Sequence, residues 1–175
     1  RRMDWNTWLL GHELPVRLGF FFGVFALVAI WELRSPRRAL SVSKATRWLN
    51  NLGLVVLNSV ILRLLFPAAA VGVAAAAANQ GWGLFNYHEV PFWLAVVASV
   101  VIMDFFIWLQ HVTVHAIPVL WRLHRVHHAD MDFDVTTGAR FHTLEILLSL
   151  FIKFAVILLL GPPAIAVLVF EVMLN

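Results

Sequence analysis

Long apolar runs alternate with short polar connections along this chain of 175 residues. The runs cover residues 15–33, 48–78, 91–115 and 141–160, and a fifth run begins at Ala164. A helix needs about 20 predominantly apolar residues to cross a bilayer. The pattern therefore predicts an all-α fold, a polytopic membrane bundle with about four to five transmembrane helices.

The run 48–78 allows two interpretations, because it is too long for one ordinary crossing and short for two. Pro67 should kink or break the helix there, since proline has no amide hydrogen to donate. The connection 79–92 contains no lysine or arginine, so we place it outside the cell, which requires a single kinked crossing. A hairpin in this run would instead move every later element to the opposite side.

Composition supports a membrane protein and excludes several other classes. Apolar residues make up 61% of the chain and charged residues 13%, an excess that a soluble domain of this size rarely shows. The net charge of +3 does not indicate nucleic-acid binding, because the basic residues gather in the connections that we place in the cytoplasm. The chain has no cysteine, which excludes disulfides and thiolate metal ligands.

The order of the runs predicts a single domain. No linker or soluble segment separates the apolar runs, so we expect residues 1–175 to form one membrane domain. The last run is unfinished at Asn175, and we therefore expect the chain to be truncated at its C-terminus.

Histidines are concentrated at the end of the third run and in the polar segment that follows it. Five of the eight lie within 18 residues there, at His111, His115, His124, His127 and His128. The first two are four residues apart, and the last three are spaced by three and four, so each group lies on one face of a helix. Pro118 is suited to begin a second short helix between the groups. We predict a cytoplasmic, histidine-rich helical segment.

This spacing favours metal binding over isolated structural histidines. Imidazole is a good ligand for zinc, copper, iron and nickel, and a single ion rarely needs five imidazoles. The count therefore indicates a site for two metal ions. By contrast, His12 and His88 stand alone near apolar ends and are interpreted as polar groups at the membrane interface.

Several acidic residues are candidates for orienting these histidines. Asp104 precedes His111 by seven residues and His115 by eleven, which returns it to the same helical face. It would either accept a hydrogen bond from a ligand histidine or pair with Arg63 or Lys153. These two alternatives are equally compatible with the pattern.

Two further groups of polar residues follow the histidines. Asp130, Asp132 and Asp134 alternate like the start of a calcium loop, but the glycine and the final glutamate of that pattern are missing. We expect them to face solvent or to brace the histidines. His142 and Glu145 share a helical face and would add a ligand and an orienting acid, or serve as interfacial polar groups.

The segment 104–145 resembles the fatty acid hydroxylase/sterol desaturase superfamily of membrane-bound non-haem di-iron enzymes. The resemblance rests on H-V-T-V-H at 111–115, H-R-V-H-H at 124–128 and D-V-T-T-G-A-R-F-H-T-L-E at 134–145. Within the superfamily, the sequence of these motifs is similar to that of bacterial members related to alkylglycerol monooxygenase. Thr143 stands where the family usually has proline. The family's second H-x2-H-H box is absent, and we expect it beyond residue 175.

The resemblance implies a lipid monooxygenase or desaturase with two iron ions. The implied metal ligands are His111, His115, His124, His127, His128 and His142. Asp104, Asp134 and Glu145 would orient them. The implied reaction is O2-dependent oxidation of a C–H bond in a sterol, fatty acyl chain or alkylglycerol. The lipid substrate would enter from the bilayer, and electrons would come from an external donor protein. The site would lie on the cytoplasmic side of a bacterial inner membrane.

Two functions of other classes fit parts of the sequence. One is a membrane protein that binds zinc without catalysis, because the same imidazoles are good zinc ligands and purified protein could carry zinc. The other is a transporter whose path is lined by Arg63, Asp104 and Lys153. These three charges are too few and too scattered to favour transport over an oxygenase.

Overall fold

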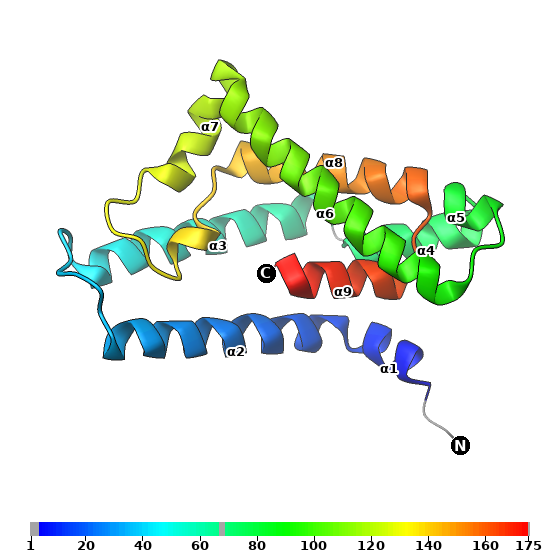
Figure 1. The fold of residues 1–175 in the computed structure, drawn as a ribbon, viewed down its shortest axis with the longest axis horizontal. Helices are drawn as coiled ribbons and strands as arrows, with labels where there is room; N and C mark the ends of the chain where they lie inside the picture. The colour runs from blue at the N-terminus through cyan, green and yellow to red at the C-terminus, as the bar shows by residue number, and fades with distance from the viewer. Residues whose placement is uncertain (1–3, 67–68, 175) are drawn as a thin grey trace. The chain divides into compact units, whose positions relative to one another are not determined.

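The computed structural model describes residues 4–66 and 69–174, and all regular structure in these residues is helical. The α-helices are α1 (Trp5–Gly11), α2 (Glu13–Arg34), α3 (Lys44–Leu65), α4 (Ala70–Gln80), α5 (Leu84–Tyr87), α6 (Phe92–Ala116), α7 (Pro118–His128), α8 (Thr143–Leu160) and α9 (Ala164–Leu174) (Figure 1). A 3-10 helix, η1 (Thr137–Ala139), precedes α8. The predicted all-α fold is confirmed.

In the part of the chain that the structure describes, four helical segments are long and apolar enough to cross a membrane. They are Glu13–Arg34, Lys44–Tyr87, Phe92–Ala116 and Thr143–Leu160. The apolar helix α9 is shorter. These segments match the predicted runs, and the described part of the second one contains three helices, α3, α4 and the short α5. The predicted kink at Pro67 lies outside the described residues.

Local sequence signals account for several helix ends. Asp4 caps α1 by accepting a hydrogen bond of 3.1 Å from the backbone amide of Asn6. Pro118 begins α7 as predicted, and Ile117 before it is extended, because proline disfavours helical dihedrals in the preceding residue. Gly81 ends α4 with φ of +69°, a left-handed conformation that glycine adopts without steric cost.

The described residues form two compact units. The first contains residues 4–22, 69–109 and 150–174, and the second contains 23–66 and 110–149. The core of the first unit is apolar. Small residues on α4, such as Ala74 and Ala77, are fully buried where α4 packs against α9. Their size allows the two helix backbones to approach closely.

A buried carboxylate joins three helices of the first unit. The Glu171 carboxylate on α9 lies 2.7 Å from Arg17 Nη1 of α2 and 2.8 Å from Lys153 Nζ of α8. Ionisable groups within apolar helices are costly unless they are paired, and Glu171 pairs two of them. Lys153 therefore has a partner other than Asp104.

This arrangement predicts a stability effect of Glu171→Gln. The substitution leaves Arg17 and Lys153 without their carboxylate, so the free energy of unfolding should fall by about 3 kcal/mol. This value is at the lower end of the range for breaking a buried ion pair, because Arg17 is partly exposed. Thermal unfolding in detergent measures the effect. Glu89→Gln, at an exposed residue, is the control and should leave the melting temperature unchanged. Equal stability of the Glu171→Gln protein and the wild type would contradict the prediction.

Candidate metal centre

Four histidines of the second unit meet between the end of α6 and α7. His111 and His115 are one turn apart on α6, and His124 and His128 are one turn apart on α7. One ring nitrogen from each of the four lies within 4.8 Å of the corresponding nitrogen of the other three. The two same-face pairs thus converge after the chain turns at Ile117.

The spacing of these nitrogens suits a single metal ion. His128 Nε2 lies 3.2 Å from His115 Nε2 and 3.2 Å from His124 Nε2. Tetrahedral metal–nitrogen bonds of about 2.0–2.1 Å place neighbouring nitrogens about 3.4 Å apart. His124 is fully buried, whereas the other three are exposed. The donor set therefore fits an ion that is bound from one side by protein and open on the other.

Glu145 determines which nitrogen of His124 is free. His124 Nδ1 donates a hydrogen bond of 2.6 Å to Glu145 Oε1, and both side chains are buried. Burial, and then the neighbouring His115 and His128, lower the pKa of His124 to about 4, so the imidazole is neutral at pH 7. With its proton on Nδ1, the ring presents the lone pair of Nε2 toward His128. A carboxylate behind a histidine in this way is typical of metal sites.

The structure does not bring the other two predicted ligands into this group of four. The ring of His127 stacks on Phe141, with ring centroids 4.6 Å apart and planes inclined by 3°. His142 Nδ1 accepts a hydrogen bond of 3.1 Å from the backbone amide of Leu144. Four of the six predicted ligands are thus close enough to share an ion.

Of the three acids predicted to orient ligands, Glu145 is the one that the structure bonds to a histidine of the group. Asp134 Oδ2 instead accepts hydrogen bonds of 2.9 Å from Arg47 and 3.0 Å from Trp48. Asp104 belongs to the first unit, where it is exposed and lines a cavity of about 350 Å³ together with Val100 and Phe170.

The expectation that the alternating aspartates face solvent is wrong, because the side chains of all three are buried, with that of Asp134 4% exposed. Asp130 and Asp132 are 8% and 2% exposed. Both carboxylates bond to groups from the earlier part of the chain, Asp130 to Arg47 and Asp132 to the backbone amides of Ser41 and Val42. These partners are 83 to 91 residues away in sequence, so no local pattern indicated the burial.

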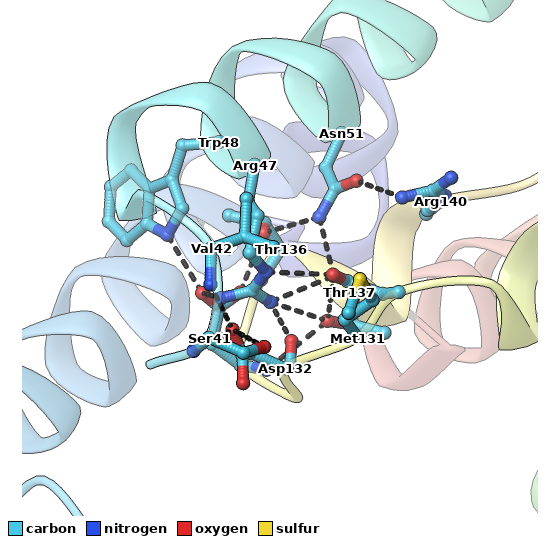
Figure 2. Close-up of polar contacts among 12 residues, drawn as sticks. Ser41, Val42, Arg47, Trp48, Asn51, Met131, Asp132, Thr136, Thr137 and Arg140 are labelled. Carbon is cyan, nitrogen blue, oxygen red and sulfur yellow. Dashed lines mark hydrogen bonds and ion pairs between the residues drawn. The ribbon is translucent and has the colours of Figure 1, made fainter. Parts of the chain in front are cut away.

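Sequence reasoning also missed a set of polar residues on α3. Arg47, Asn51 and Asn58 are the buried residues of this helix, although most of its side chains are apolar. Their spacings of four and seven residues place them on one helical face. This face, which we call the polar stripe of α3, could have been noticed as three polar positions in register within an apolar run. Figure 2 shows two of its members, Arg47 and Asn51, among their partners.

Arg47 makes the largest number of these contacts. Its Nε and Nη2 donate to the two carboxylate oxygens of Asp130 at 2.7 and 2.8 Å, and Nη1 donates to Asp134. Nη2 also donates to the backbone carbonyl of Asp132. Burial alone would raise the pKa of Asp130, but hydrogen bonds from Arg47, Thr137 and Asn51 outweigh it and hold the pKa at about 2. Asp130 is therefore a carboxylate at neutral pH.

The fold and site together define a class: a helical protein with four segments that can span a membrane and a four-histidine group that could hold a metal ion. Residues 96–175 match the model of the fatty acid hydroxylase family. The predicted resemblance is confirmed, and the family implies an oxidoreductase in the broad sense. Comparisons with curated proteins and with solved structures gave no match.

The geometry predicts that His128 contributes more to metal binding than His127. His128→Ala removes the nitrogen that lies 3.2 Å from those of His115 and His124. Co2+ affinity should fall by more than about 100-fold, which exceeds the usual effect of losing a residue that only hydrogen-bonds to a metal ligand. His127→Ala should weaken binding of the ion held by the group of four by less than about 10-fold. Titration of the purified protein with Co2+ measures both, and His88→Ala is the control. Equal losses for the two variants would contradict the structural grouping.

Proposed function

We propose that this protein is a membrane-bound non-haem di-iron oxygenase that hydroxylates or desaturates a lipid C–H bond with O2. The observation that carries the proposal is the group of four histidines within 4.8 Å, backed by the Glu145 carboxylate, in a chain that matches the fatty acid hydroxylase family. The four apolar segments support a substrate that resides in the bilayer.

The donor set is compatible with iron. Imidazole binds iron as well as zinc, and the four nitrogens have the spacing for one ion. His111, His115, His124 and His128 would hold it. The second iron of the proposed pair rests on the family resemblance, which assigns His127 and His142 as further ligands. When bound, iron would supply the O2 activation that oxidation of an unactivated C–H bond requires.

The residues of the chain would contribute orientation and access. Glu145 retains the proton on His124 Nδ1 and so leaves Nε2 free to bind. Val112 of α6, Val119 of α7 and Ile117 between the two helices are exposed apolar side chains near the histidines. They offer a lipid chain an apolar approach to the site. We propose that electrons come from a separate donor protein.

We also propose that the site lies at the cytoplasmic face of a bacterial inner membrane. Exposed basic residues of the second unit support this orientation, because positively charged connections remain in the cytoplasm. They are Arg34, Arg37, Arg38, Arg122 and Arg125.

A non-catalytic zinc protein is the competing function, since the nitrogen spacing also fits a tetrahedral zinc ion. The decisive experiment loads the protein with Fe2+ in nanodiscs of bacterial lipids, adds a reductant and 18O2, and analyses the lipids by mass spectrometry. A hydroxylase would incorporate 18O, and a desaturase would yield lipids lighter by two hydrogens. Tightly bound zinc with neither product would overturn the proposed function.

Glu145→Gln provides a second test of the site. Glutamine keeps the size of the side chain but removes the charge that accepts the His124 proton, so both metal affinity and activity should fall by about 10- to 100-fold. Metal content and lipid oxidation are measured on the same preparation, with Glu89→Gln as the matched control. Unchanged affinity in the Glu145→Gln protein would contradict the role given to this carboxylate.

A further inference from the structure

The polar stripe of α3 bonds to one segment of the chain, the connection 129–142 and the residue after it. This connection begins directly after His128 on α7 and ends three residues before Glu145 on α8. The helix before the connection, α7, carries His124 and His128 of the histidine group. The helix after it, α8, carries the carboxylate that orients His124. Any element that fixes the connection also fixes these two groups relative to each other.

Arg47 and Asn51 hold the first half of the connection. Besides the contacts of Arg47 with Asp130 and Asp134, Asn51 Nδ2 donates to Asp130 Oδ2 and to Thr136 Oγ1, each at 2.9 Å. Asn51 Oδ1 accepts a hydrogen bond of 3.2 Å from Arg140. Figure 2 shows Arg47 and Asn51 pointing from α3 into this network.

Asn58 holds the second half, where α8 begins. Its Nδ2 donates to the backbone carbonyl of Phe141 at 3.0 Å, and its Oδ1 accepts from Thr143 Oγ1 at 2.8 Å. The ring of Phe141 stacks on His127, so the anchored end of the connection also packs against α7. Glu145 follows Thr143 by two residues and reaches His124 at 2.6 Å. A displacement of about 1 Å would be enough to break that hydrogen bond.

We propose that the polar stripe of α3 is the positioning element of the metal centre. Arg47, Asn51 and Asn58 fix the connection 129–142, and through it they place Glu145 against His124. The inference rests on the proposed metal binding and adds residues outside the histidine motifs to it. Arg47 is then a positioning residue, since it acts through the connection and touches no histidine of the group.

A role in membrane orientation alone does not explain Arg47. An arginine that only marks the cytoplasmic side extends its charge into water, as long basic side chains near helix ends commonly do. Arg47 is 4% exposed and directs its donors to two aspartates and a backbone carbonyl. Arg38, in the preceding connection, provides the contrast, because its side chain is 66% exposed and reaches Asp132 at 3.5 Å.

The main test substitutes Arg47→Lys in the full chain and measures Co2+ affinity and the visible absorption spectrum of the bound Co2+. Lysine keeps the charge but cannot bridge Asp130 and Asp134 as the guanidinium does. We expect affinity at least about 10-fold weaker, the usual effect of an outer partner, and a changed spectrum. Arg38→Lys should leave both unchanged.

A loss of stability alone is distinguished by a variant of the first unit. Glu171→Gln should lower the melting temperature but leave the Co2+ affinity of the folded protein within about twofold, since its partners Arg17 and Lys153 lie in the apolar unit. If Arg47→Lys does not fold, Asn58→Leu tests the same stripe at the start of α8. A stripe variant that folds and binds Co2+ like the wild type would overturn the inference.

The double variant Arg47→Lys/Glu145→Gln tests how Arg47 acts. If Arg47 acts through Glu145, the double variant should bind Co2+ no more weakly than Glu145→Gln alone, whereas independent effects would multiply. Multiplied losses would overturn the inferred path. Failure of the wild-type protein to bind Co2+ would instead overturn the proposed function itself.

Discussion

The burial of one positive charge constrains the second unit. The Arg47 guanidinium is 4% exposed, and a charge removed from water in this way is strongly unfavourable unless its donors are paired. The pairing requires that Asp130, Asp134 and the carbonyl of Asp132 all face the same helix. Only a few conformations of the chain after α7 meet that requirement. The end of α7 and the start of α8 therefore depend on a contact made by α3.

The two units are stabilised in different ways. Among the described buried residues of the first unit, Ser99 and Glu171 are the polar ones, and the rest form an apolar core. In the second unit most of the described buried residues are polar or charged, and the apolar ones are Ala29 and Val114. Apolar packing is non-directional, whereas hydrogen bonds and ion pairs fix angles as well as distances. The unit that must place four imidazoles within a few ångströms is thus the one held by directional bonds.

This difference explains what the sequence could predict. Helix extents follow from apolar runs, and the convergence of the histidines follows from two same-face spacings and Pro118, so these were predicted correctly. The role of Glu145 beside His124 was one of two alternatives that its spacing from His142 allowed. The burial of Asp130 and its pairing with Arg47 were missed, because those residues are 83 positions apart and Arg47 also satisfies the positive-inside pattern. Long-range pairing of charges leaves no periodic signal in a single chain.

The three histidines of the motif H-R-V-H-H show why spacing alone could not separate their positions. His124 and His128 are four residues apart and share one face of α7, whereas His127 and His128 point about 100° apart on the helix. The face of His127 meets Phe141, whose carbonyl is bonded to Asn58 of the polar stripe. One turn of α7 therefore directs the nitrogens of His124 and His128 toward the histidine group, while the ring of His127 packs against Phe141 of the anchored connection. Rotation of α7 would disturb both contacts together, so the packing of His127 also fixes the direction in which His124 and His128 point.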